Sequence, residues 1–297
     1  MITITITPLT LTKRRFITLL KMMGINPWIK FIIPNQFNVT ARLFDYIALS
    51  NYTMEPYNAA LPLTIMQIVE QRGRCTFIDI GASIGDTVLL AEEALRKENS
   101  SEIYFVEGDP EFYSMAIENT KNAPHLVKGF NTFLAEKDEE LSSISIEKTS
   151  ANLTLKNSDN STGSTVKFRS LDSIAVQHSI IPNFIKIDVE GFEFKVLKGA
   201  SSLLKQYRPC ILFECNVFTE NDPELHEMFS FFEVHGYTKS FFFTNHGLLA
   251  AALPINDIKS MRKLLSKIDG KTLHFYDVLV YDDSFMFSFP LLETSQL

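Results

Sequence analysis

The feature that most constrains this fold is a repeated alternation of short apolar runs with amphipathic stretches. An apolar run without polar alternation is typical of a strand that is buried on both faces of a sheet. Strands that alternate with helices predict a doubly wound α/β sheet whose central strands are parallel. The apolar runs are residues 75–80, 103–106, 184–188 and 211–214, and the helical stretches that follow them are residues 86–97, 109–119, 192–206 and 223–234.

Several segments extend this core. We expect residues 1–70 to form a helical extension that packs on the main domain, which spans residues 71–297. A long segment separates Ala135 from Asn183, and polar alternation at residues 150–170 predicts a β-hairpin insertion there. Residues 240–244 and 276–281 are apolar and aromatic, which predicts two final strands that pair antiparallel.

Composition narrows the classes of function. A formal net charge of −7 argues against a nucleic-acid binder with a broad basic surface. The three cysteines lie in or beside apolar runs and cannot all pair with one another, so we expect a reducing, cytoplasmic setting. Lys21, Pro27 and Lys30 interrupt the apolar residues 16–33, so we expect no transmembrane segment. The basic residues 13–15 leave peripheral membrane contact as an alternative to packing of this segment on the domain.

The strongest local signal is the turn D-I-G-A-S-I-G-D at residues 79–86. Gly81 allows the backbone to leave the strand tightly and to approach a ligand. Gly85 allows close packing of the next helix against the strand, and the N-terminus of that helix offers free N–H groups. Glu107 ends the next strand, where a carboxylate can accept hydrogen bonds from the two hydroxyls of a ribose. The turn therefore predicts a cofactor that contains a nucleoside.

Two cofactor classes use a turn of this kind. A nicotinamide dinucleotide requires a second glycine beside its pyrophosphate, whereas residues 82–84 are Ala-Ser-Ile here. S-adenosylmethionine has no phosphate, and its ammonium needs an acidic or carbonyl partner. Asp79 stands two residues before the first glycine and supplies such a partner. We therefore expect S-adenosylmethionine, with a nicotinamide cofactor and a ligand-free tight turn as the alternatives.

Several blocks of the sequence resemble those of the FkbM-type methyltransferases. The resemblance extends from about residue 75 to residue 216, and the I-D-V-E-G block at residues 187–191 is its most specific part. Two positions depart from the family pattern: Ser83 stands where asparagine is commoner, and Gly108 replaces the usual proline. The blocks are FIDIGASIGDT at 77–87, FVEGDP at 105–110, SLD at 170–172, IKIDVEGFE at 185–193, VLKGA at 196–200 and ILFE at 211–214.

The resemblance implies a class I, Rossmann-like methyltransferase with a mostly parallel seven-stranded sheet that binds S-adenosylmethionine. Members of the family usually act on hydroxyl groups, so we expect O-methylation of a carbohydrate, glycolipid or polyketide-like acceptor. A nicotinamide-dependent oxidoreductase and a non-catalytic adenosyl-binding module are the alternatives. The residues expected to bind the cofactor are Asp79, Gly81, Ser83, Gly85, Asp86, Glu107, Asp109 and Ala135.

Methyl transfer to an alcohol requires a base that takes up the hydroxyl proton. In an open α/β sheet the ligand lies beyond the carboxyl ends of the strands, and we expect Asp188, Glu190 and Glu214 there as catalytic residues. The alternative for Glu190 is a helix cap, with Glu193 as a first-turn acid. Asp188 and Glu214, with Asn216, also offer the oxygen ligands that Mg²⁺ prefers. We expect no metal, and Mg²⁺ remains an alternative.

Overall fold

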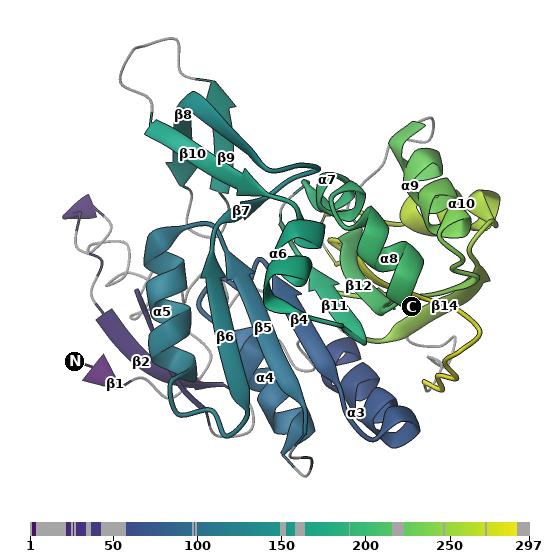
Figure 1. Cartoon of the computed structure of the whole chain (residues 1–297), viewed down its shortest axis with the longest axis horizontal. Coiled ribbons are helices and arrows are strands. Elements are labelled where there is room, and N and C mark those ends of the chain that lie inside the picture. Colours follow the sequence, from purple (N-terminus) through teal and green to yellow (C-terminus); the bar gives the residue numbers. More distant parts are fainter. Residues whose placement is uncertain are drawn as a thin grey trace.

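The computed structural model centres on an eight-stranded sheet with the order β14-β13-β15-β12-β11-β4-β5-β6 (Figure 1). Strands β6, β5, β4, β11 and β12 are parallel, and β15 runs antiparallel to β12. The strands are β4 (Thr76–Ile80), β5 (Glu102–Glu107), β6 (Leu126–Asn131), β11 (Phe184–Ile187), β12 (Cys210–Cys215), β13 (Lys239–Thr244), β14 (Leu249–Pro254) and β15 (Tyr276–Tyr281). The structure describes residues 2–3, 22–24, 26, 28–33, 37–42, 58–96, 98, 100–148, 153–157, 164–189, 191–215, 223–245, 247–270 and 272–289.

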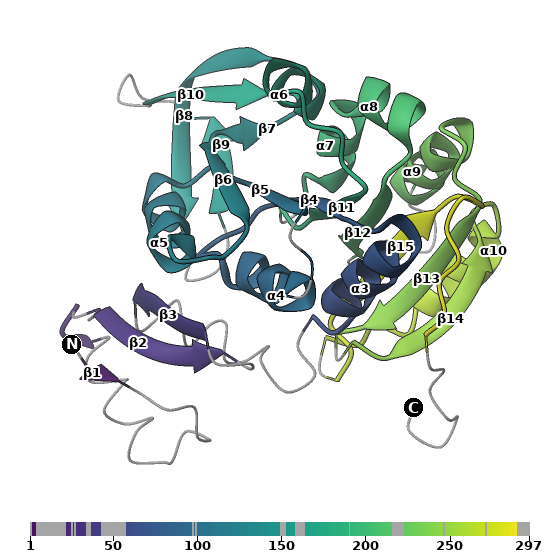
Figure 2. The same ribbon diagram turned by 60° about the horizontal axis from the view of Figure 1, so that its bottom comes forward.

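Helices cover both faces of this sheet, and each layer encloses its own apolar cluster (Figure 2). The strand order and the helix layers confirm the doubly wound class I methyltransferase fold. None of the helices in the described residues is both long and apolar enough to cross a membrane. One layer contains α3 (Ala60–Arg72), α4 (Asp86–Leu95) and α5 (Pro110–Thr120), and the other contains α6 (Leu171–His178), α7 (Glu193–Lys198), α8 (Ser201–Tyr207), α9 (Pro223–Val234) and α10 (Ile258–Leu265).

The central strands are buried along their whole length, which accounts for their apolar sequences. Every residue of β4 and of β11 is buried. Two of these residues, Asp79 and Lys186, are charged, and they are partners in the parallel register of the two strands. Because burial of a charge is unfavourable without a partner, this pair needs an explanation beyond core packing.

The sheet contains one strand more than the seven that the resemblance implied. Strand β14 pairs antiparallel with β13 at the edge of the sheet. Its sequence, LAAALP, is rich in alanine, which has a low strand propensity, so no strand was predicted there. The two expected C-terminal strands, β13 and β15, do pair antiparallel as predicted.

The helix expected over residues 192–206 is divided into α7 and α8. A Cβ atom on Gly199 would lie 2.1 Å from the carbonyl oxygen of Ala135, so the chain passes too close for any other residue. The carboxylate of Asp172 accepts hydrogen bonds from the N–H groups of Ser202 and Leu203, at 2.9 and 2.8 Å. Asp172 therefore stabilises a new helix N-terminus in the middle of the expected helix.

The described part of residues 1–70, where a helical extension was expected, contains the helix α3 and also a small sheet that was not expected. Strands β1 (Ile2–Thr3), β2 (Trp28–Ile33) and β3 (Phe37–Arg42) form this three-stranded sheet. Asn119 of α5 exchanges two hydrogen bonds with the backbone of Thr40, which attaches β3 to the core. The basic residues 13–15 lie outside the described residues.

The insertion is a small sheet with the order β7-β10-β8-β9, formed by β7 (Phe133–Leu134), β8 (Glu139–Lys148), β9 (Leu153–Asn157) and β10 (Ser164–Arg169). The two strands expected at residues 150–170 are present as β9 and β10. Their predicted pairing as a hairpin is wrong, because β8 lies between them and pairs antiparallel with both. Figure 1 places this sheet beyond the carboxyl ends of β5 and β6.

Candidate active site

The turn after β4 is held in place by the backbone of neighbouring strands. The N–H of Gly81 donates to the carbonyl of Val106 at 2.9 Å. Gly81 has a φ of +82°, and a Cβ atom on it would lie only 1.8 Å from the carbonyl oxygen of Asp188. Glycine at this position was expected to make room for a ligand, and the structure shows that the backbone of Asp188 requires a glycine there.

Gly85 and Ser83 shape the rest of the turn. Gly85 precedes α4 with a φ of +84°, and a Cβ atom on it would lie against Ala116 of α5, at 3.1 Å, rather than against a strand. Ser83 also has a positive φ, of +47°, and its N–H donates to Oε2 of Glu107 at 2.8 Å. Asp86 is buried in the first turn of α4, and no side chain among the described residues caps the N-terminus of this helix. The uncapped N–H groups therefore face the same edge of the sheet as Glu107.

Glu107 connects the ends of three segments. Its Oε1 accepts a hydrogen bond from the N–H of Asp109 at 2.8 Å, and its own carbonyl accepts one from Asn131 Nδ2 at 2.8 Å. Burial raises the pKa of Glu107 to about 7, although the N–H groups of Asp109 and Ser83 act in the opposite direction. Asp109 itself caps α5 by accepting hydrogen bonds from the N–H groups of Glu111 and Phe112.

Asp79 is completely buried at the end of β4. The hydroxyl of Thr87 donates to its Oδ2, whereas Oδ1 has no hydrogen-bond partner in the described part of the chain. The ammonium of Lys186 lies 3.9 Å from Oδ1. Burial raises the pKa of Asp79 to about 6, and Lys186 and Thr87 oppose this effect. The site therefore contains a buried carboxylate oxygen that no described residue satisfies with a hydrogen bond.

Lys186 was not identified as a site residue from the sequence. Its Nζ donates to Oδ2 of Asp188 at 2.9 Å, and its side chain is only 5% exposed. Burial by itself would lower the pKa of Lys186, but the charges of Asp188 and Asp79 hold it above its ordinary value. The available signal was a lysine inside the buried run Phe184–Ile187, which requires carboxylate partners.

A further buried acid, Asp277, comes from β15 and was also missed. It is the register partner of Glu214 on β12. Burial raises the pKa of Asp277 to about 7, and Lys186 opposes this rise. In the sequence, Asp277 is a single acid in the otherwise apolar strand β15 and gives no sign of a site. Only the antiparallel register of β12 and β15 places it beside Glu214.

The remaining predicted catalytic acids behave differently from one another. Glu214 is partly buried on β12, and Glu190 and Asn216 lie outside the described residues. Glu193 begins α7, as expected for a first-turn acid, and its Oε1 accepts hydrogen bonds from the N–H groups of Val189 and Gly191. No group of three or more His, Cys, Asp or Glu side chains in the described ranges is arranged to hold a metal ion.

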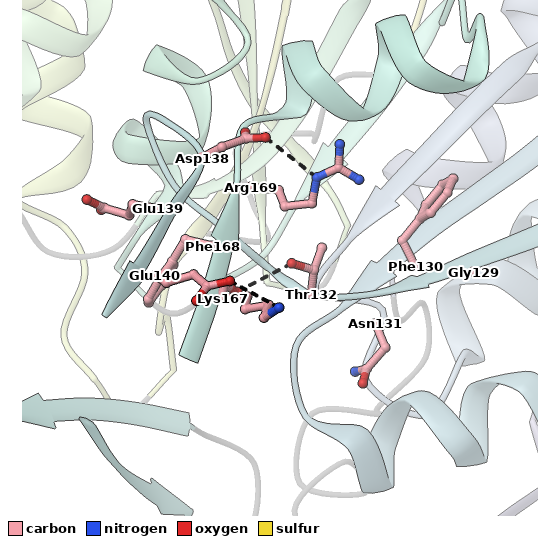
Figure 3. Close-up of a pocket in the computed structure, with 10 residues that line it drawn as sticks. All are labelled: Gly129, Phe130, Asn131, Thr132, Asp138, Glu139, Glu140, Lys167, Phe168 and Arg169. Carbon is pink, nitrogen blue, oxygen red and sulfur yellow. Dashed lines mark hydrogen bonds and ion pairs between the residues drawn. The ribbon is translucent and has the colours of Figure 1, made fainter. Parts of the chain in front are cut away.

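Ala135 and an open pocket lie toward the inserted sheet. The N–H of Ala135 donates to the carbonyl of Arg169 at 2.9 Å, which places Ala135 at the base of the insertion. The pocket has a volume of about 640 Å³ and lies between the end of β6 and strands β8 and β10 (Figure 3). Its lining residues are Gly129, Phe130, Asn131, Thr132, Asp138, Glu139, Glu140, Lys167, Phe168 and Arg169.

The structure therefore gathers most of the predicted residues at one edge of the sheet. Asp79, Glu107 and Asp188 lie at the carboxyl ends of β4, β5 and β11, respectively, which are neighbours in the sheet in the order β5-β4-β11. The chain leaves β4 toward β5 on one side and later returns to form β11 on the other. This is the switch point at which open α/β sheets bind ligands.

The sequence and the structure were each similar to known methyltransferases. A profile described as the methyltransferase FkbM domain matches residues 79–239, more than half of the chain. Three solved structures are similar: a methyltransferase FkbM from Methylobacillus flagellatus KT (13% identity, TM-score 0.44, covering 94% of this chain and 73% of that one), an O-methyltransferase from Bacillus cereus in complex with SAH (13%, 0.41, 80% and 87%) and fibrillarin from Aeropyrum pernix with natively bound S-adenosyl-L-methionine (10%, 0.41, 84% and 81%). No curated protein matches. Because the profile match spans the carboxyl edge described above, from Asp79 to the start of β13, the chain belongs to the FkbM methyltransferase family.

Proposed function

We propose that this protein is an S-adenosylmethionine-dependent O-methyltransferase that acts on a hydroxyl-rich, carbohydrate-like acceptor. The observation that carries the cofactor assignment is the buried Oδ1 of Asp79, which has no hydrogen-bond partner among the described residues. A buried acceptor of this kind is unfavourable unless a ligand satisfies it. The ammonium of the methionine end of the cofactor is a donor of the right charge.

The residues around Asp79 fit the other parts of this cofactor. Glu107 uses one lone pair of each carboxylate oxygen for Ser83 and Asp109, so both oxygens retain capacity to accept from ribose hydroxyls. The uncapped N-terminus of α4, which begins at Asp86, favours the carboxylate of the methionine end. When bound, the cofactor supplies an electrophilic methyl group.

Asp188 is our candidate for the base. Its side chain is 35% exposed at the end of β11, and Lys186 donates to one oxygen only. The other oxygen, Oδ1, accepts no hydrogen bond from the described residues and is free to take a proton from an acceptor hydroxyl. Glu214 on the next strand is a second acid on the same side, which we assign to positioning of the acceptor.

The pocket under the inserted sheet supports a hydroxyl-rich acceptor. Its lining combines two phenylalanines with an amide, carboxylates and cations. Because a hydroxyl group both donates and accepts hydrogen bonds, it can bind to each of these polar groups. Two ion pairs, Arg169 with Asp138 at 3.8 Å and Lys167 with Glu140 at 3.0 Å, border it (Figure 3). Because β6 is three strand spacings from β11, roughly 14 Å, an acceptor that reaches both the pocket and Asp188 is extended.

The function is tested by incubating the protein with S-adenosylmethionine and a panel of oligosaccharides and glycolipids, with S-adenosylhomocysteine release as the readout. The proposal expects release that depends on the acceptor. Binding of the cofactor without turnover for any acceptor would favour a non-catalytic adenosyl-binding module, and binding of NAD instead would favour an oxidoreductase. A chelator followed by Mg²⁺ tests metal dependence, since a metal-held acceptor would lose and regain turnover.

We also propose a reducing compartment such as the cytoplasm for this protein. All three cysteines, Cys75, Cys210 and Cys215, are buried and unbonded. Burial raises the pKa of each thiol, which keeps it protonated and unreactive. Free buried cysteines are typical of proteins that fold without disulfide formation.

A further inference from the structure

Among the described residues, the candidate cofactor edge contains one buried cation, Lys186, among several carboxylates. Lys186 lies at the same level as Asp79 on the neighbouring strand, and its ammonium is shared between Asp188 at 2.9 Å and Asp79 at 3.9 Å. The charge of Asp277, on β15, also favours the protonated form of Lys186 and raises its pKa. The lysine therefore stands where it opposes the mutual repulsion of these acids.

The groups that face Asp79 from each packed element are mostly acidic. Helix α4 contributes Asp86, β5 contributes Glu107, and β11 contributes Asp188 together with Lys186. The buried residues of α3 carry no charge. Loss of the lysine would therefore leave the buried Asp79 carboxylate surrounded by like charge.

We propose that Lys186 is a positioning residue that keeps the Asp79 carboxylate ionised, so that its unsatisfied oxygen can accept the ammonium of the cofactor. The inference rests on the proposed function and adds a residue that holds the site in its binding state. The 3.9 Å separation between Lys186 Nζ and Asp79 Oδ1 is consistent with this role, because the lysine stabilises the charge without occupying the oxygen as a hydrogen-bond donor.

The test measures binding of S-adenosylhomocysteine to the full chain by calorimetry between pH 5 and pH 8.5. In Lys186→Met, we expect the pH at which affinity is half-lost to rise by roughly 1–3 units, which is the effect of removing an opposite charge 4 Å away. With a wild-type midpoint near the pKa of about 6, a shift of one, two or three units weakens the affinity at pH 7 by about twofold, tenfold or ninetyfold relative to the wild type. The loss should largely disappear at alkaline pH. The ionisation of the ligand itself is common to both proteins and cancels in the ratio of their affinities.

Two controls separate this role from a structural one. 5′-Methylthioadenosine lacks the amino-acid end, so its affinity should be the same in the wild type and in Lys186→Met. Lys205→Met removes an exposed lysine from α8 and should leave the binding curves of both ligands unchanged. An affinity loss in Lys186→Met that is independent of pH, or that extends to 5′-methylthioadenosine, would overturn the proposal.

A second variant keeps the test independent of how well Lys186→Met folds. Asp188→Asn removes the competing partner of the lysine and a negative charge that opposes ionisation of Asp79, so binding should persist to lower pH than in the wild type. An unchanged or higher midpoint in Asp188→Asn would overturn the proposal. Failure of both ligands to bind the wild type would instead overturn the cofactor assignment on which the proposal rests.

Discussion

The backbone carbonyl of Asp188 fills the space that a side chain at Gly81 would need. A Cβ atom on Gly81 would lie 1.8 Å from that oxygen, and the N–H of Asp188 donates to the carbonyl of Ile80 at 2.9 Å. The two strand ends that carry the candidate cofactor and methyl-transfer acids are thus in backbone contact. Their spacing depends on a glycine, whichever ligand they bind.

The first prediction follows from this contact. Gly81→Ala should destabilise the protein by roughly 2–5 kcal/mol, because it combines a strained positive φ with a backbone clash. Gly73→Ala is the matched control, since Gly73 also has a positive φ but no atom of the described residues lies within 4 Å of its Cβ position. We expect the control to lose only about 1–2 kcal/mol. Chemical denaturation measures both values, and equal losses would contradict the assigned contact.

The second prediction concerns protons released on cofactor binding. Burial holds the pKa of Asp79 at about 6 and that of Glu107 at about 7, so both carboxyls are partly protonated in the free protein near pH 6.5. An ammonium and ribose hydroxyls favour the ionised forms, so binding of S-adenosylhomocysteine should release roughly one proton at pH 6.5 and far less at pH 8. Calorimetry in buffers of different ionisation enthalpy measures this number. Proton uptake at pH 6.5 would contradict the assignment, and Glu107→Gln should remove the larger part of the release.

The third prediction is a pH dependence of stability that arises outside the site. Nδ1 of His125 lies 2.8 Å from Oε2 of the buried Glu92, and Nε2 contacts the carbonyl of Glu98. Burial alone would lower the pKa of His125, but these two partners raise it above 6.5. A raised folded-state pKa means that the charged histidine stabilises the fold fully below about pH 6.5 and loses this contribution as pH rises through the folded value.

The measurement compares melting temperatures of the wild type and His125→Gln from pH 5.5 to pH 9. At pH 6 the free energy of unfolding should be roughly 1–3 kcal/mol lower in the variant than in the wild type, and its melting temperature should be lower accordingly. The difference in melting temperature should narrow toward pH 9. His226→Gln, at an exposed position on α9, is the control and should track the wild type throughout. A difference in melting temperature that grows with pH would show that the charged form of His125 does not stabilise the fold.

The parallel core was predictable from the sequence because burial on both faces leaves a local signal. Strands β4 and β11 are short apolar runs, and the first is followed at once by a glycine turn. The strand pairing of the insertion was predicted wrongly, because a hairpin pairs two strands that are adjacent in the sequence, whereas β9 and β10 both pair with β8. Strand β8 is rich in serine and glutamate, and its place between β9 and β10 depends on pairing across the whole insertion.

The site residues also differ in whether a local signal in the sequence identifies them. Asp79 and Glu107 could be identified because each ends a strand at a fixed offset from the glycine turn. Lys186 and Asp277 could not, since their importance comes from the alignment of strands that are distant in the sequence. A buried charge inside an apolar run was the one local indication, and it predicts a partner without naming it.

The last prediction separates cofactor binding from chemistry at Asp188. Asp188→Asn keeps the size of the side chain and an oxygen that can accept from Lys186, but it removes the basic oxygen at the exposed end of β11. Turnover with an identified acceptor should therefore fall about 100-fold or more, whereas affinity for S-adenosylhomocysteine at pH 8 should stay within a factor of about two. If Asp188 only satisfies Lys186, the variant should lose thermal stability and keep its activity per folded molecule. Near-normal turnover together with an unchanged melting temperature would contradict both roles, because the carboxylate would then be needed neither for proton removal nor for the charge of the buried lysine.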